Sequence, residues 1–111
     1  MFSMPPRARM FTGFQPTGEL HIGNYVGAIE NASRLCDDYE GVLCVVDYHA
    51  MTIPYDPKEM LGRILHVASM LLASGLTPDR STLFVQSAVP EHAELAWILS
   101  TVTPMGDLSR M

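Results

Sequence analysis

Two kinds of apolar pattern alternate along this chain. Short apolar runs typical of strands occupy residues 9–14, 42–46 and 82–86. The run 42–46 is continuously apolar, as in strands buried on both faces of a parallel sheet. Stretches in which apolar residues recur every three or four positions are typical of amphipathic helices, and they cover about 23–38, 57–74 and the region from Pro90 onward. The pattern therefore predicts strand, helix, strand, helix, strand and helix, in that order.

The second predicted helix has clear signals at both ends. Asp56 is placed to cap its start, Pro57 suits the first helical position, and Glu59 stands three residues after the cap. Gly75 is placed to end the helix in the left-handed conformation that glycine adopts without steric cost. Close to Met111, Asp107 is a candidate cap for one further helix.

This alternation predicts an α/β fold with a parallel sheet, corresponding to the first half of a doubly wound, Rossmann-like nucleotide-binding fold. Right-handed crossovers make the three strands parallel neighbours. Residues 1–9 are expected to form an irregular tail, and residues 10–111 the first half of this fold. Because half a sheet leaves a strand edge exposed, and exposed edges pair with other chains, we expect a dimer or a larger assembly.

Composition narrows the class of protein. The 111 residues are 48% apolar and 17% charged, so the chain is long and apolar enough for one folded domain. A net charge of −5 argues against a free-standing nucleic-acid binder, which is usually basic. Cys36 and Cys44 both fall in apolar surroundings and are interpreted as buried thiols of a cytosolic protein. No signal peptide or apolar run of about 20 residues is visible, so we predict a soluble, cytoplasmic protein with no membrane association.

Polar residues follow each predicted strand. In a parallel sheet the carboxyl ends of the strands meet at one edge, and ligands collect there. The residues concerned are Gly13, Gln15 and Thr17 after the first strand, Asp47, Tyr48 and His49 after the second, and Gln86 and Ser87 after the third. This clustering predicts a binding site at that edge.

The loop GFQPTGELHIGNY, after the first strand, has features of an anion site. Gly13 and Gly18 carry no side chains, so a ligand has room to approach the backbone. Gly23 and Asn24 open the next helix, where free N–H groups and the helix dipole favour negative charge. His21 and Asn24 are possible donors to phosphate. The spacing matches neither the Walker loop nor Gly-x-Gly-x-x-Gly, so an ordinary strand-to-helix turn is the alternative.

Read as a whole, the segment PTGELHIGNY resembles the first signature of the class I aminoacyl-tRNA synthetases, whose core is His-Ile-Gly-His. His21, Ile22 and Gly23 match this core, and Asn24 replaces the second histidine, as in the tryptophanyl branch of that family. Other stretches resemble the same branch, namely GFQPTGELHIGNYVGAI, VVDYHAMT, LFVQSAVPEHAELAWIL and MGDLSRM. Together they cover residues 10–111, which the resemblance implies are the N-terminal half of a class I synthetase catalytic domain. Tyrosyl enzymes share the first signature but lack the Gln-Ser-x-Val-Pro-x-His stretch in this form.

The resemblance implies a reaction and a set of site residues. It implies activation of L-tryptophan by ATP with Mg²⁺, transfer to tRNA(Trp), and a homodimer whose interface draws on the region after the third strand. Residues that it implies for ATP are Gln15, Pro16, Thr17, Gly23 and Asn24, and those for catalysis are His21, Asn24 and Thr17. Residues that it implies for the tryptophan pocket are Phe11, Gly13 and His49. No metal-ligating residue is implied.

Each assignment has an alternative in the fold itself. His21 is otherwise a loop histidine, His49 a core histidine bonded to backbone, Phe11 a core residue, and Asp47 a residue that orients a neighbouring loop. His92 is expected at the surface or an interface, and Trp97 in packing or at a subunit contact.

The family's Lys-Met-Ser-Lys-Ser signature and anticodon domain lie outside these residues, so we expect an N-terminal fragment with little activity alone. The alternative functions are a small nucleotidyltransferase with a related loop, and a truncated, non-enzymatic paralogue that binds nucleotide or a partner subunit.

Overall fold

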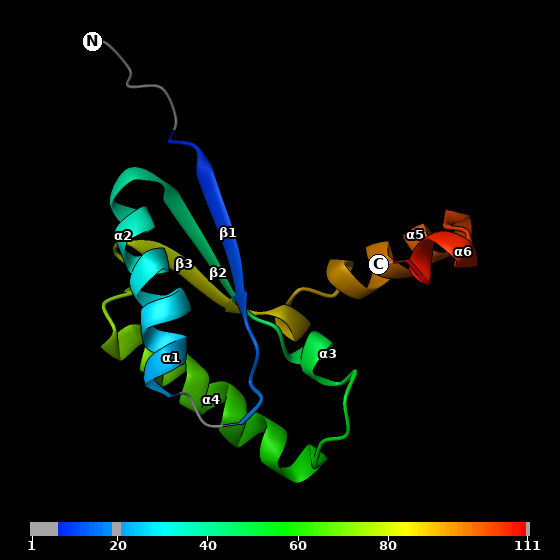
Figure 1. Ribbon diagram of the computed structural model, residues 1–111, viewed down its shortest axis with the longest axis horizontal. Coiled ribbons are helices and arrows are strands. Elements are labelled where there is room, and N and C mark those ends of the chain that lie inside the picture. Colours follow the sequence, from blue (N-terminus) through cyan, green and yellow to red (C-terminus); the bar gives the residue numbers. More distant parts are fainter. Residues whose placement is uncertain (1–6, 19–20, 111) are drawn as a thin grey trace.

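A computed structural model describes residues 7–18 and 21–110, and its centre is a three-stranded sheet (Figure 1). The strands are β1 (Arg9–Phe14), β2 (Glu40–Val45) and β3 (Ser81–Val85). They are all parallel and lie in the order β1-β2-β3, with Phe14 opposite Val45 and Val45 opposite Val85. The predicted α/β fold with three parallel neighbouring strands is confirmed.

Helices follow each strand. They are α1 (Ile22–Asn24), the π-helix η1 (Tyr25–Ile29), α2 (Glu30–Asp38), α3 (Asp47–Ala50), α4 (Pro57–Ala73), the 3₁₀ helix η2 (Gln86–Ala88), α5 (Glu91–Val102) and α6 (Met105–Leu108). The first three are continuous and together form the helix predicted over 23–38.

One face of the sheet packs against α2 and α4. Alternate strand residues point to this face, and they form the core with the apolar stripes of the two helices. Leu43 in β2 and Leu71 in α4 are completely buried, and burial of such a side chain stabilises a fold by about 1.5–3 kcal/mol. On the other face of the sheet Phe11 is 65% exposed, because no helix among the described residues covers it.

The predicted ends of α4 are confirmed in detail. Asp56 Oδ1 accepts the N–H of Lys58 at 2.9 Å, and Pro57 occupies the first helical position. At the other end Gly75 has φ 88°, and the N–H of Leu76 bonds the carbonyl of Leu71 at 3.2 Å. With the Gly75 N–H on the Leu72 carbonyl at 3.1 Å, this is a Schellman cap.

Arg80 fastens the segment after α4 to helix α2. Its guanidinium donates to the carbonyl of Gly75 at 2.9 Å, the carbonyl of Ser33 at 3.0 Å and the carboxylate of Asp37 at 2.7 Å. One planar fork therefore joins two helices across 43 to 47 positions of sequence, at the edge of the sheet where β3 begins.

Some boundaries differ from the prediction. Strand β2 begins at Glu40 instead of 42 and ends at Val45, and β3 is displaced by one residue to Ser81–Val85. Helices α3 and η2 were not predicted, because four and three residues are too few to produce a helical period. In the first helix, the Asn31 side chain donates to the carbonyl of Gly27, inside the π segment, at 3.0 Å.

The two cysteines are free and buried, as predicted. Burial raises the pKa of the Cys36 thiol, and it raises that of Cys44 to about 11, with the nearby charge of Asp47 adding to the effect. Both thiols are therefore neutral and unreactive at ordinary pH.

Helix α5 has a different environment from the other long helices. Figure 1 shows α5 and α6 extending away from the sheet, and no residue of α5 is buried. Trp97 is 73% exposed. The prediction that it packs is therefore wrong for the described residues, and a subunit contact stays a prediction. No helix of residues 7–18 and 21–110 has the length and apolar character of a membrane span.

Candidate functional site

The loop after β1 and the start of the first helix enclose a cavity at the carboxyl edge of the sheet. Its volume is about 340 Å³, and its lining residues are Gly13, Phe14, Gln15, Thr17, Asn24 and Ala28. We call it the loop cavity. The fold thus brings together four residues that the sequence analysis predicted for the site: Gly13 at the end of β1, Gln15 and Thr17 in the loop, and Asn24 in the helix.

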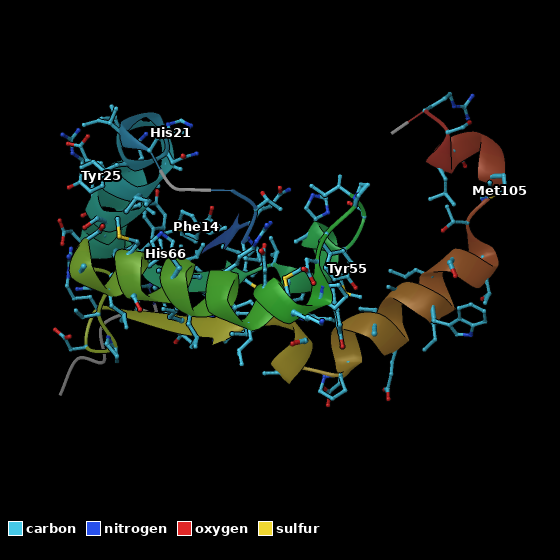
Figure 2. The ribbon with its side chains drawn as sticks, turned by 90° about the horizontal axis from the view of Figure 1, so that it is seen from below. Phe14, His21, Tyr25, Tyr55, His66 and Met105 are labelled. Atoms are coloured by element: carbon cyan, nitrogen blue, oxygen red, sulfur yellow. The ribbon has the colours of Figure 1, made fainter. Side chains whose placement is uncertain are left out.

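The helix beyond this loop begins with a reciprocal cap formed by two motif residues. His21 Nδ1 accepts the N–H of Gly23 at 3.1 Å, and Asn24 Oδ1 accepts the N–H of His21 at 3.0 Å. This is a capping box in which histidine and asparagine take the places usually held by serine and glutamate. Figure 2 shows His21 at the exposed start of the helix.

The cap decides which groups face a ligand. Because Nδ1 of His21 accepts a hydrogen bond, the neutral ring carries its proton on Nε2, which is then available as a donor. The N–H of Gly23 is occupied, so the expectation that it is free for an anion is wrong in this conformation. A Cβ at position 23 would lie 3.0 Å from the His21 ring, so glycine there lets the ring fold back.

The loop itself combines an anchored residue with accessible ones. Pro16 is fully buried, whereas Gln15 is exposed and Thr17 half-buried. The hydroxyl of Thr17 donates a long hydrogen bond of 3.4 Å to Gln15 Oε1. Gly18 has φ 70°, a conformation that disfavours residues with a side chain. The polar side chains of Gln15 and Thr17 are thus held at the cavity by a buried proline between them.

The residues assigned to tryptophan do not line one cavity among the described residues. Gly13 lines the loop cavity, and Phe11 borders a separate hollow of about 330 Å³ between the free edge of β1 and the first helix. His49 is exposed on α3. A Cβ at Gly13 would lie 2.9 Å from Val46 Cγ1, so glycine is needed where β1 passes the end of β2.

Asp47 has a structural contact of the kind anticipated for it. It is 6% exposed, and its Oδ1 accepts the N–H of Tyr48 at 3.1 Å and that of Ser87 at 3.0 Å. Its carboxylate therefore holds the segment that follows β2 against the segment that follows β3.

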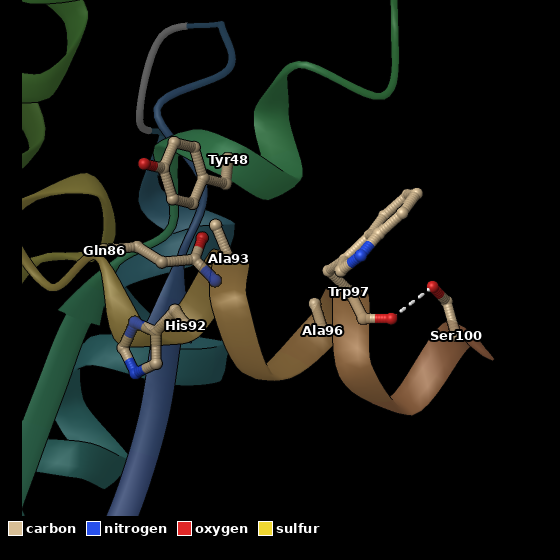
Figure 3. A pocket seen from close by; sticks show the side chains of 7 residues that line it. All are labelled: Tyr48, Gln86, His92, Ala93, Ala96, Trp97 and Ser100. Atoms are coloured by element: carbon tan, nitrogen blue, oxygen red, sulfur yellow. Dashed lines mark hydrogen bonds between the residues drawn. The ribbon is translucent and has the colours of Figure 1, made fainter. Parts of the chain in front are cut away.

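A second cavity lies at the base of α5, and two of its lining residues, Tyr48 and Gln86, were predicted to lie at this edge of the sheet (Figure 3). Its volume is about 450 Å³, and it is lined by Tyr48, Gln86, His92, Ala93, Ala96, Trp97 and Ser100. Gln86 Oε1 and His92 Nδ1 are buried without a hydrogen-bond partner among the described residues, and the His92 ring lies 5.8 Å from that of Phe84. In the sequence, the polar run after β3 indicated this region. The burial of Gln86 Oε1 and His92 Nδ1 could not be predicted, because the helix that follows is otherwise exposed.

The donor set at this edge of the sheet does not suit a protein-bound metal. Among residues 7–18 and 21–110, no group of three or more histidine, cysteine, aspartate or glutamate side chains is close enough to hold an ion. The loop cavity offers amide and hydroxyl groups instead. Such groups bind a ligand that brings its own charge.

Comparison with known proteins gives a consistent result. A family model described as tRNA synthetases class I (W and Y) matches residues 5–111. A tryptophan–tRNA ligase of Caldanaerobacter subterraneus subsp. tengcongensis is 52% identical over 103 residues, which are 93% of this chain and 32% of that protein. A crystal structure of tryptophanyl-tRNA synthetase from Campylobacter jejuni gives a TM-score of 0.86 at 41% identity, covering 94% of this chain and 33% of that one.

A second crystal structure of the Campylobacter jejuni enzyme is complexed with ADP and tryptophan. It gives a TM-score of 0.86 at 42% identity, and the match covers 92% of this chain and 32% of that one. The chain thus spans about a third of the length of the relatives it matches.

Proposed function

The chain belongs to the family of class I tRNA synthetases (W and Y), and from this we infer that it forms the first part of the catalytic domain of a tryptophan–tRNA ligase. In the reaction, a carboxylate oxygen of L-tryptophan attacks the α-phosphorus of ATP, the bond to the bridging oxygen breaks, and pyrophosphate leaves. A ribose hydroxyl of tRNA(Trp) then attacks the carbonyl carbon of the adenylate, and AMP leaves. The family match runs through residues 82–111, which a nucleotidyltransferase with a related loop leaves unexplained.

The loop cavity is the observation that carries this proposal for ATP. It places Gln15, Thr17 and Asn24 around a hollow beside the start of a helix, where the backbone dipoles favour negative charge. The relative solved with ADP and tryptophan supports the same pair of ligands here. Adenylation needs little covalent chemistry from side chains, so such a site acts by positioning and by stabilising charge.

We assign the side chains as follows. Gln15 and Thr17 donate to phosphate oxygens, Gly23 and Asn24 lie under the adenosine, and the buried Pro16 fixes the loop between its polar neighbours. His21 approaches the phosphates with its Nε2–H, the donor that its cap leaves free. The donor groups of Gln15, Thr17 and His21 stabilise negative charge as the bond to the leaving pyrophosphate breaks.

Phe11, Gly13 and His49 are assigned to tryptophan. Phe11 and Gly13 lie two positions apart in β1 and therefore share a face of the sheet, the one that the described helices leave open. Glycine at position 13 lets Val46 pack closely against β1, and an exposed His49 on α3 provides a donor. Mg²⁺ is expected to arrive with the phosphates of ATP, because the described residues offer it no carboxylate cluster.

The assembly is proposed to be a cytoplasmic homodimer. Helix α5 supports an interface, because its large apolar residues are all more than half exposed, namely Leu95, Trp97, Ile98, Leu99 and Val102. In sedimentation of the longest reading frame that contains this chain, the protein should behave as a dimer and Trp97→Arg should shift it toward monomer. Leu61→Arg, on an equally exposed position of α4, is the matched control and should not. A wild-type monomer at high concentration would contradict the proposal.

Tryptophan-dependent exchange between ATP and pyrophosphate tests the function. The longest reading frame that contains this chain should exchange with tryptophan and not with tyrosine, and it should charge tRNA(Trp). Because this chain spans about 32% of its relatives, the 111 residues alone should exchange poorly. Chelation of Mg²⁺ should abolish exchange in the longer protein.

Two substitutions test the residues assigned to ATP and to tryptophan separately. Gln15→Ala removes one hydrogen bond to a charged phosphate, and should raise the KM for ATP about tenfold with little effect on that for tryptophan. His49→Ala should do the reverse. Equal activity with tyrosine, or no exchange with any amino acid, would refute the proposed function.

A further inference from the structure

A buried carboxylate joins two strand ends at the carboxyl edge of the sheet. Oδ1 of Asp47 accepts N–H groups from Tyr48 and Ser87, which belong to α3 and η2. The two segments that it joins are 40 residues apart in sequence. None of the substrate assignments above uses this side chain.

The bond to Ser87 lies beyond the last pair of the β2–β3 ladder. That pair is Val45 and Val85, after which both strands leave the sheet. In the part of the chain that the structure describes, the bond from Ser87 to Asp47 is the one hydrogen bond between α3 and η2. The hydrogen bond of Asp47 therefore joins the two segments beyond the point where the β2–β3 ladder ends.

Helix α3 depends on this bond because it is very short. It has four residues, and its other anchors are the buried side chain of Ala50, which is 1% exposed, and the N–H of its N-cap residue Val46, which donates to the carbonyl of Phe14 at 3.0 Å. The same helix carries His49, whose side chain is exposed and forms no hydrogen bond with the described residues. The position of this imidazole is thus set by the backbone of α3, and the position of α3 is set in part by Asp47.

We propose that Asp47 is a positioning residue for the tryptophan pocket, holding α3 against η2 and so fixing where His49 meets the substrate. The role rests on the proposed function for the identity of the substrate, and on the hydrogen bonds for the positioning. Asp47 touches neither substrate and acts through His49.

Four variants of the longest reading frame test this role. Asp47→Ala removes the acceptor and should raise the KM for tryptophan about tenfold, while the KM for ATP stays within about twofold. Asp47→Asn keeps an oxygen acceptor at the same place and should restore most of the affinity. In a His49→Ala background, Asp47→Ala should have almost no further effect, because the residue through which it acts is gone.

The matched control is Asp56→Ala. Asp56 also accepts a backbone N–H with its Oδ1, from Lys58 at 2.9 Å, but it caps α4. It should leave the KM for tryptophan unchanged. Equal increases in both KM values, or a full effect of Asp47→Ala in the His49→Ala background, would overturn the inference.

Hydrogen exchange separates this inference from the proposed function. Asp47→Ala should speed exchange of the amides in 47–51 and 86–88 and leave α4 unchanged, whatever reaction the protein catalyses. Wild-type protein without tryptophan-dependent exchange would refute the function alone, whereas unchanged amide protection at Ser87 would refute the positioning role.

Discussion

Gly41 offers a sharp test of how β2 packs against α2. An alanine Cβ at this position would lie 2.5 Å from Cys36 Sγ and 3.3 Å from the Cβ of Ser81. Cys36 is 4% exposed and Ser81 8% exposed, so neither neighbour is free to move into solvent. Overpacking of a buried site costs about 1–3 kcal/mol, and since both neighbours are enclosed we expect Gly41→Ala to lower the free energy of unfolding by about 2–3 kcal/mol.

The contact distances predict which second change restores stability. Cys36→Ala removes the sulfur, leaving the Cys36 Cβ at an ordinary 3.7 Å from the new methyl group. The double variant should therefore lose less stability than the sum of the single variants, with a coupling of about 1–2 kcal/mol. The contact with Ser81 stays tight, so the recovery is incomplete.

Replacement of a different glycine, Gly62, by alanine should have the opposite effect on the free energy of unfolding. Gly62 lies in α4, where an added Cβ meets no atom within 4 Å. Gly62→Ala should raise the free energy of unfolding by about 0.5–1 kcal/mol through helix propensity. Urea unfolding followed by far-UV circular dichroism measures the free energy of unfolding of the wild type and of all four variants. The packing argument is refuted if Gly41→Ala differs from wild type by less than about 0.5 kcal/mol, or if Cys36→Ala gives no relief.

Three further changes probe other contacts by the same unfolding measurement. Arg80→Ala should lower the free energy of unfolding by about 2 kcal/mol, because one guanidinium serves four acceptors, and Arg80→Lys should recover only part of it; full recovery by lysine would contradict the fork geometry. The raised pKa of Cys44 means that the folded protein keeps a proton that the unfolded chain loses, so stability should fall as pH rises from 9.0 to about 11. Cys44→Ala should flatten this window, and an unchanged pH profile would argue against burial as the cause. Asn24→Ala removes the acceptor for the His21 N–H and should cost about 1 kcal/mol, whereas Asn24→Asp should keep the cap; equal losses in the two variants would rule the cap out.

Elements with strong local signals could be predicted from the sequence. Helix α4 has a proline start, an aspartate cap and a glycine end within one segment, and the structure has all three where they were expected. The order of strands followed from alternation and from the handedness of crossovers. The clustering of Gly13, Gln15, Thr17 and Asn24 followed in turn, because all four residues lie on the single connection from the end of β1 to the helix after it.

Features that depend on contacts between distant residues could not be predicted. That Asp47 and Ser87 lie at the same edge was predicted from the parallel strands, but the hydrogen bond between them depends on where β2 and β3 each end, which no local pattern encodes. His92 was expected at the surface or at an interface, yet its Nδ1 is buried beneath the base of an otherwise exposed helix. The reciprocal cap of His21 and Asn24 could not be predicted, because histidine is an unusual capping residue.

The site residues differ in how strongly the fold itself requires them, and this decides which substitutions report on function. Glycine at 13 is needed beside Val46, Pro16 is fully buried, and Asn24 caps a helix, so changes at these positions disturb the fold whatever the ligand is. Gln15 and His49 are exposed, and the structure gives them little to stabilise. Replacement of an exposed side chain usually changes stability by less than about 0.5 kcal/mol. If substitution of Gln15 or His49 strongly lowers the affinity for ATP or tryptophan, a loss of stability cannot be the cause. These two positions, not the motif glycines, therefore carry the decisive information about what the site binds.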